Sequence, residues 1–321
     1  MEIWTRRSEY VKTHSFCHEQ WKWHELDFIT ENDELRKLTA GYNVPDLWLA
    51  LAGYDEHNKL QMNRNAQQED AIWGSLVYKL DPADRETQQI FHFFLSRDML
   101  ITGNRDFSSW ADMAKEPMLR KMETTDTAIE GLMIIAGTLI TGFLKQINAL
   151  AMDIQDLRWD LKKSNGQDVL DRLTALRHQL LVIRNLTIPV KEIHMAITEI
   201  FEEQNQRKQF YEQAGVQLDR CHFLIQEYTK EVSAMVSSEE IMASVTGNEV
   251  VKTLTVITLL FTPITAWGAW WGMNFIHMPE LNEKYGYLFS GLFIFSNIAL
   301  LYIYIQRKGW LGDLLNGKKQ R

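Results

Sequence analysis

The chain contains 321 residues, of which 34 are Lys or Arg and 42 are Asp or Glu, so its formal net charge is −8. This length is enough for one large or two smaller domains with a buried core. The acidic balance argues against a nucleic-acid-binding protein, which normally carries a basic patch or stripe. Cys17 and Cys221 lie far apart, which argues against a disulfide framework and favours a reducing compartment. Because residues 1–9 lack the apolar segment of a secretory signal, we expect the large N-terminal part to stay in the cytoplasm.

The first 116 residues mix strand and helix patterns, and we expect them to form a cytoplasmic α/β domain. Strand patterns occur at residues 20–28, 74–80, 91–95 and 99–102, and helix patterns at residues 31–40, 46–51 and 106–114. Residues 117–188 are expected to form a cytoplasmic helical hairpin, because two amphipathic segments flank the turn residues Ser164-Asn165-Gly166. The uncharged run at residues 131–144 is too short to span a bilayer, so it is predicted to be a core helix.

Residues 189–252 are expected to form a long stalk helix, since no proline occurs between Pro189 and Pro263. Apolar positions there recur at alternating spacings of 3 and 4, which is typical of helices that pack side by side. These positions are Leu218, Cys221, Ile225, Tyr228, Val232 and Met235. Only Gly247 interrupts the approach to the next apolar segment, so we predict one continuous helix, about 100 Å long, that enters the membrane.

Two segments near the C-terminus, residues 253–274 and 287–306, are predicted transmembrane helices. Each contains an uncharged run close to the ~20 residues that cross a bilayer. Trp267, Trp270 and Trp271 cluster at one boundary, as interfacial aromatics do. The tail at 307–321 is basic, so the positive-inside rule places both termini in the cytoplasm and the loop at 275–286 outside. These features disfavour the alternative, a pair of buried helices in a soluble protein.

An uncharged stripe follows one side of the helix expected from residue 248 onward. On a 3.6-residue helix its members fall within a sector of roughly 120°. They are Asn248, Val251, Leu254, Thr258, Thr262, Thr265 and Ala269. The stripe suggests a pore lining, although membrane threonines also hydrogen-bond their own backbone or a neighbouring helix. In the second span, Asn297 is better explained by a bond between helices than by ion contact.

The first span ends in Gly272-Met273-Asn274, and Met278-Pro279-Glu280-Leu281 follows shortly after. Both motifs resemble the signature and outer loop of the CorA magnesium-transporter family, the two-transmembrane GMN metal ion transporters. The resemblance is strongest over residues 245–311 and continues upstream as the order of the elements. It implies an α+β membrane protein that assembles as a homopentameric funnel, with five copies of the first span around a pore. It also implies a location in the cell inner membrane.

The resemblance implies Mg²⁺ as the transported ion, with Co²⁺ and Ni²⁺ as further candidates, and no cofactor. Mg²⁺ gives up its water reluctantly. A ring of Asn274 side chains and nearby carbonyls can accept hydrogen bonds from a hydrated ion without stripping it, and an uncharged lining lets the ion leave again. Gly272 allows the chain to turn at the helix end. In the outer loop, Glu280 and Glu283 are expected to concentrate cations, although Lys284 offsets one of them.

Two positions depart from the family pattern. Thr262 stands where many members place a bulky methionine before the pore-helix proline, so the apolar gate is expected at Val251 and Leu254. Ala50 and Gln213 stand where members often place a pair of aspartates that bind regulatory magnesium between subunits. Asp46 and Glu212 are the neighbouring carboxylates that are candidate regulatory residues.

Two other functions are open. The first is a zinc transporter of the ZntB branch of the same superfamily, which usually has another aliphatic residue at the place of Met273. The second is a membrane-anchored coiled-coil scaffold, which the uncharged threonine stripe and the GMN end disfavour. The sequence contains no nucleophile–base pair, Gly-rich phosphate loop or zinc-ligand spacing that would support an enzyme.

Overall fold

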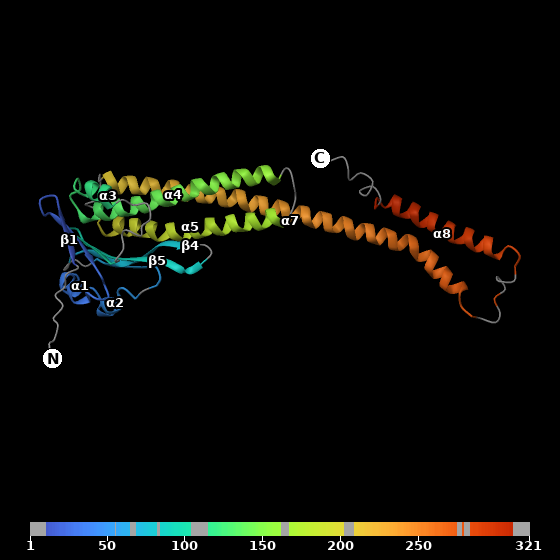
Figure 1. The fold of residues 1–321 in the computed structure, drawn as a ribbon, viewed down its shortest axis with the longest axis horizontal. Coiled ribbons are helices and arrows are strands. Elements are labelled where there is room, and N and C mark those ends of the chain that lie inside the picture. The colour runs from blue at the N-terminus through green and yellow to red at the C-terminus, as the bar shows by residue number, and fades with distance from the viewer. Residues whose placement is uncertain are drawn as a thin grey trace. The chain divides into compact units, whose positions relative to one another are not determined.

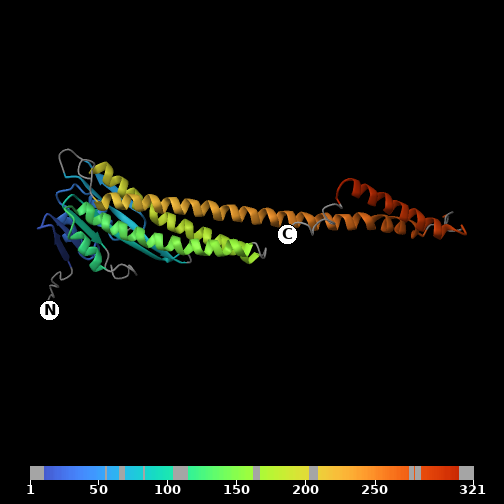
Figure 2. The ribbon, with the colours of Figure 1, turned by 90° about the horizontal axis from the view of Figure 1, so that it is seen from above.

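The structure, a computed structural model, describes residues 11–54, 56–64, 69–81, 84–103, 115–161, 167–201, 209–274, 278 and 283–310. The chain divides into an N-terminal unit that ends at Val236 and a C-terminal unit that begins at Ser237. Figure 1 shows the elements of both units in chain order. Helix α7, Gln209–Trp271, contributes to both units, as its course in Figure 2 shows. The predicted continuity from the stalk into the first apolar span is therefore confirmed.

The N-terminal unit contains a six-stranded sheet of order β1-β2-β6-β5-β4-β3. Only β2 and β6 pair in parallel, and the other neighbours are antiparallel. The strands are β1 Lys12–Phe16, β2 Trp21–Leu26, β3 Lys59–Asn63, β4 Ala71–Asp81, β5 Asp84–Leu95 and β6 Met99–Gly103. The four predicted strands form the interior of the sheet. The edge strands β1 and β3 were not predicted: residues 12–16 show no alternation of polar and apolar side chains, whereas the alternation at residues 59–63 was a signal that the prediction missed.

Helices cover both faces of this sheet. Adjacent strand residues contribute to different cores: Phe93 and Leu100 belong to one cluster, and Phe94 and Ile101 belong to the other. On one face lie the predicted short helices, α1 Asn32–Leu38 and α2 Asp46–Leu51, and on the other lie α3 Lys115–Met122, α4 Ala128–Leu161 and α5 Gln167–Ile200 (Figure 1). The N-terminal unit thus has three layers, and the expected α/β domain is confirmed. The helix predicted at residues 106–114 lies outside the described residues.

Helix α5 corrects the expected start of the stalk at residue 189. It continues through Pro189 as far as Ile200, and the next helix, α7, begins at Gln209. The reason is that the apolar stripe of α5 does not stop at the proline. Its buried members at alternating spacings of 4 and 3 are Leu186, Val190, Ile193, Ile197 and Ile200. Packing of this stripe outweighs the single backbone hydrogen bond that proline removes.

The heptad positions of α7 pack against α4 and α5 within the same chain. Leu218, Cys221, Ile225 and Val232 are buried in the main core, and Tyr228 and Met235 pack at its margin. Ion pairs reinforce this contact: Lys191 Nζ lies 3.0 Å from Asp219 Oδ1, and Arg158 pairs with Glu231. The side-by-side packing that the spacing predicted is confirmed.

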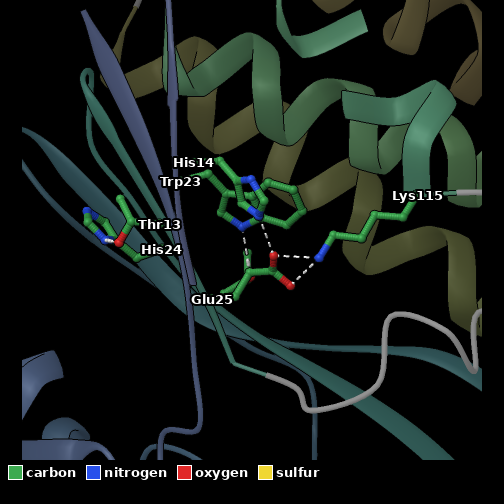
Figure 3. Close-up of polar contacts among 7 residues, drawn as sticks. Thr13, His14, Trp23, His24, Glu25 and Lys115 are labelled. Carbon is green, nitrogen blue, oxygen red and sulfur yellow. Dashed lines mark hydrogen bonds and ion pairs between the residues drawn. The ribbon is translucent and has the colours of Figure 1, made fainter. Parts of the chain in front are cut away.

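A polar cluster ties the edge strand β1 and the start of α3 to β2 (Figure 3). Both oxygens of the Glu25 carboxylate accept hydrogen bonds from Lys115 Nζ, at 2.6 and 2.8 Å, and Oε1 also lies 2.8 Å from His14 Nε2. Lys115 Nζ lies 5.4 Å from the centre of the Trp23 ring, on which the His14 ring also packs. This cluster neutralises a carboxylate that is only 13% exposed.

The C-terminal unit consists of the rest of α7 and of α8, Gly286–Arg307. The two helices meet through aromatic rings: the Trp267 ring lies 4.9 Å from that of Phe293 in a T-shaped arrangement, and Trp271 also packs on Phe293. Within the described residues, α4, α7 and α8 are long and apolar enough to cross a membrane. In the most apolar stretch of α4, 67% is buried inside the protein, as predicted for a core helix. The corresponding share is 11% in α7 and 6% in α8.

Candidate functional site: the exposed face of α7

The two sides of α7 differ in the C-terminal unit. Val256 and Pro263 are buried, and Trp267 packs against α8. On a 3.6-residue helix these three positions lie opposite the uncharged stripe. All members of the stripe are exposed, namely Asn248, Val251, Leu254, Thr258, Thr262, Thr265 and Ala269. The residues that the sequence grouped on one face therefore share the side of α7 that α8 leaves uncovered.

The threonine hydroxyls of this face donate to the backbone of their own helix. Thr258 Oγ1 donates to the carbonyl of Leu254 at 2.8 Å, and Thr262 Oγ1 donates to that of Thr258 at 2.7 Å. Thr265 Oγ1 lies 3.0 Å from the carbonyl of Thr262. Each hydroxyl proton is thus used inside the helix, while the oxygen keeps acceptor capacity. A face of this kind presents acceptors without net charge, which suits the water shell of a cation.

Four exposed polar residues of the same sector were not predicted, namely Ser237, Glu240, Ser244 and Thr255. Thr255 Oγ1 donates to the carbonyl of Val251 at 2.8 Å, as in the other threonines. Glu240 falls in the sector two turns before Asn248, and it is exposed. Continuing the same 3.6-residue projection through every position from 237 to 271 would have found all four residues.

The tripeptide Gly272-Met273-Asn274 lies where α7 ends. The backbone N–H of Gly272 donates to the carbonyl of Gly268 at 3.0 Å, and that of Met273 lies 3.4 Å from the carbonyl of Trp270. A Cβ added to Gly272 would lie 2.9 Å from the Gly268 carbonyl oxygen, so a glycine fits this exit best. Asn274 follows Met273 and is exposed, three residues beyond the last residue of α7.

Of the two outer-loop carboxylates, the structure describes only Glu283. Glu283 is exposed and precedes the equally exposed Lys284 at the approach to α8. Glu280 lies outside the described residues. Among the residues that the structure describes, no group of three or more His, Cys, Asp or Glu side chains could hold a metal ion.

The candidate regulatory carboxylates belong to different layers of the N-terminal unit. Asp46 begins α2, is 94% exposed, and accepts a hydrogen bond from Arg36 Nη1 at 3.0 Å. Glu212 is exposed in the first turn of α7, in the helical layer on the other face of the sheet. Because the sheet separates them within one chain, the two could share a cation only between subunits.

The fold and this face define a class of protein. A three-layer α/β domain precedes two adjoining apolar helices whose outward surfaces have no protein cover, and lipid is the solvent that suits such surfaces. One of the two helices carries an uncharged face on which threonine hydroxyls present hydrogen-bond acceptors. The chain is therefore a membrane protein of the kind that moves ions.

Known proteins place the chain within this class. It matches the family model described as CorA-like Mg2+ transporter protein over residues 18–307. Magnesium transport protein CorA of Bacillus subtilis is 37% identical over 301 residues, which cover 94% of this chain and 95% of that protein. Cobalt/magnesium transport protein CorA of Thermotoga maritima is 43% identical over 65 residues, which cover 20% of this chain and 18% of that protein.

Among solved structures, the complete CorA magnesium transporter from Methanocaldococcus jannaschii is similar with a TM-score of 0.60 and 17% identity, and the match covers 92% of this chain and 93% of that one. At this identity the likeness concerns the fold alone. The match to the family model and the Bacillus relative show that the chain belongs to the CorA-like Mg²⁺ transporter family. It is accordingly an ion transporter and not an enzyme.

Proposed function

We propose that this protein mediates passive influx of hydrated Mg²⁺ through a pore lined by α7 helices from five copies of the chain. Co²⁺ and Ni²⁺ are further candidate ions. The observation that carries the proposal is the uncharged face of α7, which stays exposed from Asn248 to Ala269 while the opposite face packs on α8. Assembly around an axis would turn this face toward a common channel.

The chemistry of the face favours a hydrated ion. Water bound to Mg²⁺ presents its hydrogens outward, and the ion releases this water reluctantly. The oxygens of Thr258, Thr262 and Thr265 accept such hydrogens, because their own protons are donated to the helix backbone. A ring of Asn274 at the outer end would make the first such contact, with Gly272 and Met273 holding the exit of the helix. Weak contacts of this type allow the ion to leave as well as to enter.

The pore needs a gate and a driving force. Val251 and Leu254 are 62% and 64% exposed and are the large apolar members of the face, so rings of these residues would form a hydrophobic constriction. A membrane potential of ~100 mV drives a divalent cation inward by about 4.6 kcal/mol, from roughly 2.3 kcal/mol per charge. This is enough for entry without a coupled ion or cofactor.

The central test is Mg²⁺ flux into liposomes that contain the pure full-length protein, with an imposed inside-negative potential. Asn274→Ala should abolish uptake and leave the assembly intact. The matched control is Asn297→Ala in α8, where the side-chain amide donates to the Phe293 carbonyl at 2.9 Å, and it should retain flux. Wild-type flux in Asn274→Ala would refute the proposed selectivity ring.

The same liposomes separate the alternatives. Zn²⁺ uptake that exceeds Mg²⁺ uptake under equal gradients would favour the zinc transporter. Absence of flux of any divalent cation, with an intact oligomer, would favour the membrane-anchored scaffold.

We further propose that the protein lies in the cell inner membrane with both termini in the cytoplasm and Glu280 and Glu283 outside, where they attract cations. In a Cys17→Ser background, Tyr285→Cys should react with an impermeant thiol reagent in intact cells, whereas Lys308→Cys should not. Cys221 will not interfere, because burial raises the pKa of its thiol to about 12. The reverse labelling pattern would invert the topology.

Asp46 and Glu212 are proposed as substitutes for the regulatory aspartates, joined across a subunit interface. Flux measured against internal Mg²⁺ should then lose its inhibition in Asp46→Asn with Glu212→Gln. Steep inhibition in the double variant would place the sensor elsewhere.

A further inference from the structure

A cavity of about 910 Å³ opens between the C-terminal end of α7 and the start of α8. Its lining includes Trp267, Trp271 and Phe293, with Tyr287 beside them and the charged pair Glu283 and Lys284. We propose that this cavity binds the headgroup of a phospholipid that carries a primary ammonium together with a phosphate, as ethanolamine phospholipids do. This inference goes beyond the proposed function, since it concerns a lipid and not the transported ion.

The walls of the cavity are suited to the membrane–water boundary. Trp267 and Trp271 pack with ring centres 5.6 Å apart, and Phe293 closes against Trp267 edge to face at 4.9 Å. Amphipathic aromatic rings of this kind concentrate at the level of lipid headgroups. The rings also attract a cationic group through their faces. A volume of about 910 Å³ lies in the range of pockets that hold organic molecules and far exceeds what one hydrated cation needs.

The two charges specify the headgroup. The Glu283 carboxylate can pair with an ammonium, and the Lys284 ammonium can pair with a phosphate, so adjacent residues complement both ends of a zwitterion. Lys284 alone would pair with the phosphate of an ethanolamine phospholipid or of phosphatidylglycerol, but the neutral glycerol of phosphatidylglycerol cannot offset the repulsion between that phosphate and the neighbouring Glu283 carboxylate. The quaternary ammonium of phosphatidylcholine cannot donate a hydrogen bond to Glu283. The pair therefore favours an ethanolamine headgroup over both.

The cavity is separate from the proposed ion pathway. Trp267 and Trp271 lie on the side of α7 that meets α8, whereas Thr262 and Thr265 lie on the opposite, uncovered side. Lipid bound here would rest against the outer surface of the two helices and would not enter the channel. Because Glu283 is also proposed to attract cations, lipid binding is measured directly and not through ion flux.

The experiment is native mass spectrometry of the full-length protein in detergent, titrated with phosphatidylethanolamine, phosphatidylglycerol or phosphatidylcholine of identical acyl chains. Wild type should retain phosphatidylethanolamine most tightly. Glu283→Gln should lower the affinity for phosphatidylethanolamine by about fivefold, which corresponds to roughly 1 kcal/mol for a partly exposed ion pair. It should not lower the affinity for phosphatidylglycerol. Lys284→Gln should lower the affinity for both phosphatidylethanolamine and phosphatidylglycerol. Both side chains are exposed, so neither substitution removes buried packing.

The matched control is Lys308→Gln at the far end of α8, which removes the same charge outside the cavity and should leave all three affinities unchanged. Equal affinity of the wild type for the three lipids would overturn the proposal. So would tighter binding of phosphatidylglycerol than of phosphatidylethanolamine, or an affinity for phosphatidylethanolamine that neither cavity substitution changes.

Discussion

The most apolar stretches of helices α4 and α7 have equal mean hydropathy, yet the first is mostly buried in protein and the second is mostly exposed. In α4, 67% of this stretch is buried inside the protein, and in α7 only 11% of it is buried. The apolar residues of α4 face the sheet and α5, whereas those of α7 are covered on one side only, by α8. Hydropathy thus reports that a helix avoids water, but the rest of the fold decides whether protein or lipid replaces it.

The largest effect expected from this difference comes from a buried charge. Ile140 in α4 is 0% exposed, and Ile140→Asp should unfold the N-terminal unit, at a cost of about 4 kcal/mol or more. Phe295 in α8 is 71% exposed, and Phe295→Asp should instead reduce membrane integration, at about 3 kcal/mol near a helix centre. Protease resistance and alkaline extraction of membranes measure the two outcomes separately.

Thr141→Asp, one position along α4 and exposed, is the control and should change neither measurement. If Ile140→Asp reduced membrane integration while the N-terminal unit stayed protease-resistant, α4 and not the core would be the membrane helix.

A second prediction concerns the close fit of α4 on the sheet. A Cβ added to Gly131 would lie 2.5 Å from the Trp21 ring, whereas one added to Gly142 in the same helix meets no atom within 4 Å. Gly131→Ala should therefore lower stability by about 2 kcal/mol through overpacking. Gly142→Ala should raise it by about 0.5 kcal/mol through helix propensity. Thermal unfolding of the full chain in detergent tests both, and shifts of the same sign would contradict the close contact.

A third prediction compares two ion pairs of the N-terminal unit. Lys115→Met keeps the apolar stem of the side chain but removes the ammonium that pairs with the mostly buried Glu25 carboxylate. The substitution should lower the free energy of unfolding by about 1.5 kcal/mol. Arg36→Met removes the partner of Asp46, which is 94% exposed, and should cost less than about 0.5 kcal/mol. Unfolding midpoints at low and high salt measure the difference. A larger loss in Arg36→Met would mean that Asp46 is covered in the assembled protein.

The smallest expected effect is a pH dependence of the α5–α7 contact. Burial lowers the pKa of His194 and of His222 from the usual 6.5, and the nearby Lys191 lowers both further. The charge of Asp219 opposes both shifts, and the hydrogen bond with the Tyr211 backbone also opposes that of His194. The unfolded chain therefore binds more protons than the folded chain just below pH 6.5. Stability should be full above this pH and fall as the pH drops toward the lowered values.

Thermal unfolding midpoints measured from about pH 7.5 to about pH 5.5 test this expectation, because this range brackets the usual histidine pKa of about 6.5. His222→Gln should flatten the profile, because the substituted side chain cannot take up a proton. A midpoint that rises on acidification would show that the folded state binds the protons instead.

Local periodicity was sufficient for much of the fold. The interior strands, the helices α1 and α2, and the heptad packing of α7 followed from spacing alone, since each buries one face of a regular element. The edge strand β1 did not, because its partner and not its own pattern holds it in place, whereas β3 carries a polar/apolar alternation that the prediction missed. The end of α5 was also wrong in the sequence prediction, since the packing of Val190 and Ile193 carries the helix past Pro189.

For the candidate site, the sequence by itself determined the two apolar helices, the uncharged stripe from Asn248 to Ala269 and the Gly272-Met273-Asn274 end. A helix in lipid must satisfy its own backbone, so its faces can be read directly from the sequence. Only the tertiary structure decided that α8 covers the opposite side of α7 and that Asp46 and Glu212 lie on different faces of the sheet. These features depend on which distant segments meet, and no local pattern encodes that.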